Sequence, residues 1–176
     1  MRATAFILFA AFALTIASTN ALSFNNVVIT EATKSVDLNT QLVYEDSFIT
    51  FKNTGSSAIN ELYFAIETSY LPRVALITVE DPKNGSLYTH QKVNDAETEK
   101  KHNATLFKIN LKWGLAPGKE LKIKISVTYY QRMEPLPKKI TTTEDQYVVY
   151  EDSAYIFSPY KINTQSSEYK LAGNVK

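Results

Sequence analysis

Side chains that could act as nucleophiles or metal ligands are scarce in this sequence of 176 residues. Cysteine is absent, and the only histidines, His90 and His102, lie in polar stretches that are typical of loops. Neither the H-E-x-x-H pattern of zinc peptidases nor the G-x-S-x-G pattern of serine hydrolases occurs. We therefore predict no catalytic residue, no metal site and no cofactor.

Two acidic pairs, Glu144-Asp145 and Glu151-Asp152, are the remaining candidates for catalysis. Paired carboxylates hydrolyse glycosidic bonds when they face each other across a cleft at a set separation. Adjacent residues of a strand point to opposite faces, so neither pair fits that arrangement. A glycosidase is a minor alternative, and measurable turnover by the purified domain would reveal it.

Two sites for covalent modification are present, because Asn84-Gly85-Ser86 and Asn103-Ala104-Thr105 both match N-x-S/T without a central proline. Both lie in polar stretches between expected strands, where a bulky glycan is tolerated. We predict Asn84 and Asn103 as N-glycosylation sites, provided that the chain reaches the glycosylation machinery.

The first 21 residues have the layout of a cleavable secretory signal peptide. A basic start at Met1-Arg2 precedes an uncharged apolar stretch, residues 3–17, and Thr19 and Ala21 occupy the −3 and −1 positions before the cut. The apolar stretch is too short to cross a bilayer comfortably, which disfavours the alternative of an uncleaved anchor. No later apolar stretch is long enough to span a membrane.

The chain after the signal peptide is read as a lumenal domain at residues 22–165, followed at residues 166–176 by the start of a further segment. Residues 167–171 begin a strand-like alternation just before the sequence stops, which favours a fragment over a naturally frayed terminus.

The formal net charge of +1 argues against a nucleic-acid partner. Without cysteine, stability must come from a packed core or from partners.

Strict alternation of apolar and polar residues predicts strands, most clearly at residues 121–129. Residues 107–113 alternate in the same way, and residues 114–118 hold Pro117 and Gly118, which favour chain reversal. We therefore expect a hairpin with a lysine-rich outer face. Further strands are expected at 27–30, 36–44, 47–52, 59–67, 74–79, 146–150 and 155–157, and residues 96–102 are read as a loop. This spacing predicts an all-β fold, an antiparallel β-sandwich.

Tyrosines gather in the last third of the chain, at Tyr147, Tyr150, Tyr155 and Tyr160 among others. Tyrosine buries a large area and keeps a polar tip, so core packing or a protein interface is favoured over a ligand platform. We predict these four residues as interface residues.

The stretch from Gln146 to Gln165 resembles the ribophorin I family. Its specific part runs from Val148-Val149-Tyr150-Glu151 to Ser158-Pro159-Tyr160. Weaker matches cover most of the remaining mature chain, at residues 35–38, 115–118, 129–130, 135–137 and 140–141.

The resemblance implies a non-catalytic accessory subunit of the oligosaccharyltransferase complex, placed on the lumenal side of the endoplasmic reticulum. That complex transfers a preassembled oligosaccharide from dolichyl diphosphate to Asn of N-x-S/T, and a different subunit holds its catalytic residues. The implied partners are the other subunits and nascent polypeptides. Membrane association would come through partners or through a C-terminal part that this sequence lacks.

The rival interpretation is a free secreted β-sandwich that binds carbohydrate or peptide through exposed aromatic rings. The coding sequence beyond Lys176 distinguishes the two, because a longer lumenal region and a membrane span of about twenty residues would favour the subunit.

Overall fold

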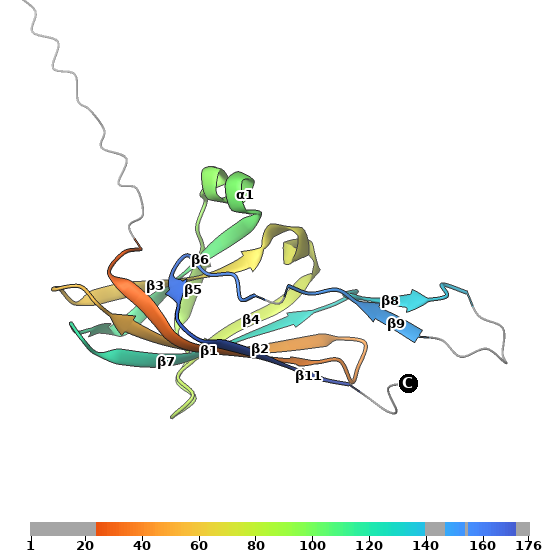
Figure 1. Ribbon diagram of the computed structural model, residues 1–176, viewed down its shortest axis with the longest axis horizontal. Coiled ribbons are helices and arrows are strands. Elements are labelled where there is room, and N and C mark those ends of the chain that lie inside the picture. The colour runs from red at the N-terminus through yellow and green to blue at the C-terminus, as the bar shows by residue number, and fades with distance from the viewer. Residues whose placement is uncertain (1–23, 140–146, 154, 172–176) are drawn as a thin grey trace, which may run out of the picture.

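The computed structural model describes residues 24–139, 147–153 and 155–171 of the chain. The predicted signal peptide, residues 1–21, and the acidic pair Glu144-Asp145 lie outside the described residues. Strands dominate the described part and form two layers, beyond which a two-stranded ribbon extends (Figure 1). The predicted all-β sandwich is thereby confirmed.

One layer is a six-stranded sheet built around two long antiparallel neighbours, β1 (Val27–Asp37) and β2 (Val43–Asn53). Strand β7 (Glu120–Tyr129) pairs with β2, and β4 (Val74–Glu80) forms the edge beyond it. The predicted alternation in β7 is present, since Ile123 is buried and its neighbour Lys124 lies on the outer face, where it pairs with Asp46 and Glu80.

The second layer contains three strands in the order β3 (Ile59–Glu67), β6 (Ala104–Leu115) and β5 (Thr89–Lys92). A 3₁₀ helix, η1 (Thr68–Arg73), follows β3. The expected loop at residues 96–102 is wrong, because this stretch forms helix α1 (Ala96–His102). Its Glu and Lys residues favour helix, and Asp95 accepts the first helical hydrogen bond at 3.0 Å from Glu99 N.

The core lies between the two layers and draws on both. Phe51 and Ile123 of the first sheet and Leu62 and Ile109 of the second are fully buried. Each such side chain contributes roughly 1.5–3 kcal/mol when it leaves water. Packing of this kind replaces the disulfides that the sequence lacks.

The predicted hairpin of residues 107–129 is wrong in its pairing, although both of its strands exist. Strand β6 pairs with β3 and β5, whereas β7 pairs with β2 and β4. The reversal at residues 114–118 therefore carries the chain from one layer to the other. Gly118 has a φ of 72°, the conformation for which glycine was predicted there.

Asn53 holds this crossover in place. Its Nδ2 donates to the carbonyl oxygens of Ser57 and Leu115, both at 2.8 Å, and its Oδ1 accepts from Gly55 N at 2.9 Å. The side chain is fully buried, so these bonds replace water completely. One amide thus joins the β2–β3 turn to the β6–β7 crossover.

Several smaller predictions need correction. The stretch 36–44 is not one strand, because Asp37 Oδ1 accepts from Asn39 N and turns the chain between β1 and β2. Residues 155–157 form no strand, although Ile156 packs on the core. His90 lies in β5, where the sequence indicated a loop, beside the rings of Phe64 and Phe107.

Strand β10 (Lys161–Ile162) and strand β11 (Gln165–Lys170) both pair with β1 in parallel. The sheet is therefore mixed, where purely antiparallel pairing was expected. Six residues of β11, beginning at Gln165, are in register with Ala32 to Asp37. The predicted boundary at residue 165 falls inside this sheet.

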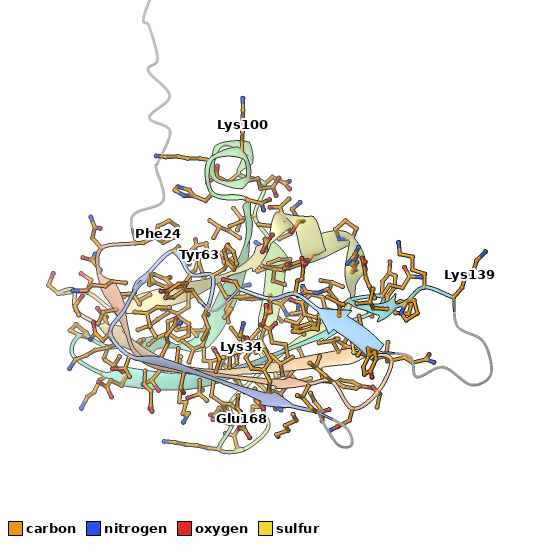
Figure 2. All side chains as sticks on the ribbon, turned by 45° about the vertical axis from the view of Figure 1, so that its right-hand side comes forward. Phe24, Lys34, Tyr63, Lys100, Lys139 and Glu168 are labelled. Atoms are coloured by element: carbon orange, nitrogen blue, oxygen red, sulfur yellow. The ribbon has the colours of Figure 1, made fainter. Side chains whose placement is uncertain are left out.

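The ribbon consists of β8 (Met133–Leu136) and β9 (Tyr147–Tyr150), paired antiparallel. It follows β7 directly and extends past the ends of the two layers (Figure 1). We call it the arm. Its base, at Met133 and Tyr150, packs on the core, while its far end reaches Lys139 (Figure 2).

Candidate functional site

Four charged side chains meet inside the sandwich at the base of the arm: Lys34, Glu45, Arg132 and Asp152. We call them the ionic cluster. They come from β1, β2, the turn before β8 and the segment after β9. The cluster thus joins the two longest strands of the first sheet to both strands of the arm.

Asp152 is the centre of the cluster. Its Oδ2 lies 2.6 Å from Lys34 Nζ and accepts from the Tyr169 hydroxyl at 3.1 Å, while its Oδ1 lies 3.8 Å from Arg132 Nη2. Two cations and a phenol therefore hold one carboxylate from three sides. The side chains of Lys34 and Asp152 are only 3% and 10% exposed, so water screens their attraction little.

Lys34 points inward because it occupies an inner position of β1, between the buried residues Ala32 and Val36. Its side chain reaches into the space between the layers (Figure 2). Besides Asp152, its Nζ donates to the carbonyl oxygen of Ser153 at 2.8 Å. A buried ammonium without such partners would cost several kcal/mol.

Arg132 is held by aromatic rings as well as by charge. Its guanidinium carbon lies 3.3 Å from the ring centre of Tyr70, and 5.1 and 5.2 Å from the ring centres of Tyr129 and Tyr150. Its Nη2 donates to the carbonyl of Glu151 at 2.7 Å. Cation–π contacts in a desolvated site contribute about 2 kcal/mol, so Arg132 fixes the start of β8 against η1 and β7.

Glu45 is the titratable member of the cluster. The pKa of its carboxyl is raised to about 7, and burial is the main cause. The charge of Asp152 also raises this pKa, whereas the charges of Lys34 and Arg132 lower it. Near neutral pH this group is divided between its charged and neutral forms. Burial also raises the pKa of the Tyr129 and Tyr150 hydroxyls above the ordinary range, so both stay protonated.

A cavity of about 50 Å³ lies against the cluster, between the layers. Its lining is mixed, with charged residues such as Glu45 and Asp152 and apolar residues such as Phe64 and Ile156. A water needs roughly 10–15 Å³ of such space, so a few waters fit. Among the described residues, the buried Tyr150 hydroxyl has no protein hydrogen-bond partner, and an ordered water would satisfy it.

The arm above the cluster exposes large apolar side chains. Leu136, Tyr147 and Val148 are 55%, 56% and 62% exposed, and Val149 is 39% exposed. An isolated two-stranded ribbon is only marginally stable in water. The ionic cluster supplies what the short ribbon lacks, because it clamps the residues on either side of the arm to the sandwich.

The four predicted interface tyrosines separate into two groups. Tyr147 on the arm and Tyr155 are exposed, the latter at 74%. Tyr150 is half-buried next to Arg132, and Tyr160 is buried in the core. Only Tyr147 and Tyr155 are therefore available to contact another protein, and for these two residues the interface prediction is still open.

Tyr160 has an internal role instead. Its hydroxyl accepts from Tyr63 N at 3.0 Å, and its ring packs edge-on against Phe24 and Phe51. It joins the segment after the arm to both layers. Burial is the main cause of its raised pKa.

The two sequons occupy different surroundings. Asn84 lies in the exposed turn after β4, and Asn103 lies between α1 and β6. Both asparagines are exposed, as the prediction of glycosylation requires, and that prediction stands untested. Among the described residues, no cluster of three or more side chains is suited to hold a metal ion.

Sequence reasoning missed the ionic cluster, although one signal for it is present in the sequence. Lys34 and Glu45 interrupt the inward-facing apolar positions of β1 and β2, where a charged residue needs a buried partner. The partners are a long way off in the sequence, so no local pattern identifies Arg132 or Asp152. In the sequence, Asp152 stands out only as half of the acidic pair Glu151-Asp152.

A model of one protein family, described as Ribophorin I, matches residues 27–175. Subunit 1 of the dolichyl-diphosphooligosaccharide–protein glycosyltransferase of Caenorhabditis elegans is 27% identical over 76% of this chain and 22% of its own length. Subunit 1B of the same enzyme from Arabidopsis thaliana is 27% identical over 84% of the chain and 33% of its own length. The chain thus spans about a fifth to a third of these relatives.

Solved structures give a weaker likeness. Native yeast LTA4 hydrolase is 13% identical, with a TM-score of 0.45 over 71% of this chain and 18% of its own length. An M1 zinc metallopeptidase from Deinococcus radiodurans is 11% identical, with a TM-score of 0.37 over 63% of this chain and 22% of its own. Among the described residues, no helix is long and apolar enough to cross a membrane.

Proposed function

The chain belongs to the ribophorin I family, and from this premise we propose that it is a non-catalytic docking domain of an oligosaccharyltransferase subunit. It lies on the lumenal side of the endoplasmic reticulum and binds sister subunits, and it supports the transfer of oligosaccharide to Asn of N-x-S/T. Relatives named as subunits of that enzyme support this assignment.

The observation that carries the docking role is an apolar arm on a rigid base. The arm exposes Tyr147 and Val148, and the ionic cluster fixes its direction. A binding element that is ordered before it meets its partner loses less conformational entropy on association. The occupant we assign to the arm is an apolar surface of a sister subunit.

The interior of the domain supports a role without catalysis. Lys34, Arg132 and Asp152 are paired with one another or with carbonyl groups, so their charges are already engaged within the domain. The oligosaccharide donor and the acceptor peptide would thus be handled by other subunits. Nascent chains are a further proposed partner, for which the exposed tyrosines are the available contact residues.

Co-purification with the complex tests the proposal. Tyr147→Ser and Val148→Ser remove apolar contact area from the arm while leaving the core untouched, and each should weaken assembly about tenfold or more if it lies at the centre of the interface. Leu87→Ser is the matched control, because Leu87 is 72% exposed and pairs with Glu80, at the end of β4 opposite to the one beside the arm. Equal recovery of all three variants would refute docking through the arm.

One observation favours the rival, a secreted carbohydrate-binding module. Trp113 is 78% exposed, and Lys112 Nζ lies 5.9 Å from its ring centre. A bare indole is a suitable platform for a sugar ring. Binding to a glycan panel that disappears in Trp113→Ala, from a protein recovered in the medium and not with the complex, would favour this rival.

A further inference from the structure

The sequon at Asn103 is built into the junction between α1 and β6. Asn103 has a φ of 49°, a left-handed conformation that asparagine tolerates better than most residues. Its Nδ2 donates to Glu67 Oε1 at 3.2 Å, and its carbonyl oxygen accepts from Thr68 N at 2.9 Å. The acceptor amide is exposed, but the backbone around it is fixed by the end of β3.

The third residue of this sequon is completely buried. Thr105 is 0% exposed, and its Oγ1 lies 3.1 Å from Thr68 Oγ1 and donates to Glu99 Oε1 at 3.2 Å. In the sheet, Thr105 is opposite Ile66, and the adjacent Leu106 is also buried. Thr68, which follows β3 directly, and Glu99 of α1 cover the Thr105 hydroxyl, so a transferase reaches it only when the start of β6 lies away from the end of β3 and from α1.

The sequon at Asn84 is open throughout. Asn84, Gly85 and Ser86 are all exposed in the turn after β4, and Asn84 Oδ1 accepts from Ser86 N at 2.9 Å. No strand pairing covers Ser86 among the described residues. The two sequons therefore share one three-residue pattern, but the hydroxyl residue is exposed to solvent in the first, at Ser86, and buried in the second, at Thr105.

We propose that Asn103 accepts a glycan only while the β3–β6 pairing is unformed, whereas Asn84 accepts one both before and after folding. The hydroxyl at the third position is part of what defines an acceptor, so a transferase must reach it. In the reaction a bond forms between Nδ2 and the anomeric carbon of the sugar, and the bond from that carbon to the lipid diphosphate breaks. The amide loses one proton, and the lipid diphosphate leaves with the electron pair.

A glycan added early is compatible with the fold. The Asn103 side chain is exposed, and after transfer its Nδ2 keeps one hydrogen for Glu67. The inference shares with the proposed function only the lumenal placement of the chain, and it does not depend on docking through the arm. The co-purification test of docking can therefore fail while the glycosylation test succeeds, and the glycosylation test can fail while docking is supported.

The test uses the unglycosylated full chain with solubilised oligosaccharyltransferase and a lipid-linked oligosaccharide, with glycans detected by mass spectrometry. Asn103→Gln leaves only Asn84, and Asn84→Gln leaves only Asn103. Both substituted side chains are exposed, and because the glutamine that replaces Asn103 would occupy a left-handed position, thermal unfolding of both proteins verifies that they are native before the assay. The native Asn103→Gln protein should gain a glycan, and the native Asn84→Gln protein should gain none.

Two unfolded forms of the Asn84→Gln protein complete the test. Adding Ile66→Asp places a charge in the core opposite Thr105 and should restore modification of Asn103. Trypsin cleavage of the original Asn84→Gln protein yields the peptide 102–108, which carries the sequon without the fold and should also be modified. Modification of native Asn84→Gln at the rate of native Asn103→Gln overturns the proposal, as does failure of native Asn103→Gln or of the peptide to gain a glycan.

Discussion

The carboxylate of Asp152 lies 2.6 Å from the ammonium of Lys34, although 118 residues separate them in the chain. This contact joins the first strand of the sandwich to the segment that leaves the arm. Since Lys34 is almost completely buried, the pair holds the chain that leaves the arm against β1.

Removing one partner of this pair should be far more harmful than removing both. We expect Asp152→Ala to lower the free energy of unfolding by about 3–5 kcal/mol, because it leaves a buried ammonium unpaired. The double variant Lys34→Met/Asp152→Leu should lose much less, because the ammonium is removed together with its partner while Arg132 keeps the Glu151 carbonyl and the Tyr70 ring. Urea unfolding measures both, and similar losses in the two proteins would show that the pair contributes packing rather than charge compensation.

Stability should fall as the pH rises through neutrality because of Glu45. Its pKa in the folded chain, about 7, lies above its ordinary value of 4.5, so the folded state binds the proton more tightly. The contribution is fully present below pH 4.5 and is lost as the pH passes 7. Between about pH 5 and pH 8 the loss should be about 2 kcal/mol, since one pKa unit corresponds to about 1.4 kcal/mol.

Glu45→Gln is the matched variant for this pH effect, since it keeps the shape and removes the proton. Its unfolding free energy should vary less over the same pH range. An unchanged pH dependence in this variant would assign the effect to another group.

Tyr160→Phe should destabilise the domain by about 1–3 kcal/mol, because it leaves the Tyr63 amide without its acceptor in a partly buried place. The ring and its contacts with Phe24 and Phe51 remain. Thermal unfolding measures the change. Tyr155→Phe is the control, since its 74% exposed side chain should give no measurable loss.

Asn53→Ala should cost about 2–4 kcal/mol, because it leaves the two carbonyls and the Gly55 amide without their partner. Asn39→Ala in the exposed β1–β2 turn is the matched control and should change stability by less than about 0.5 kcal/mol. Hydrogen exchange at the crossover should rise only in the first variant.

The sequence predicted the elements that depend on local alternation. Strand β7 and the buried side of β3 follow directly from period-two patterning, because one face of each strand meets the core. The pairing of β6 was not predictable in this way, since a turn such as residues 114–118 serves equally for a hairpin and for a crossover between layers.

The candidate site was less accessible to sequence reasoning. The tyrosine block indicated where the chain is unusual, but alternation cannot tell that Tyr160 enters the core while Tyr155 stays outside. The ionic cluster depends on contacts such as Lys34–Asp152, whose partners are so far apart in the sequence that no local pattern connects them. An inward-facing lysine in a strand shows that a partner is needed without showing which residue supplies it.

The parallel pairing of β11 with β1 has a consequence for synthesis. The ribosome makes β1 first, yet one edge of β1 stays unpaired until residues 161–170 arrive. During that interval the growing chain offers an open strand edge, which invites association with other chains. A nascent chain interrupted before residue 161 would keep that edge open, so it would remain prone to pairing with the strands of other chains.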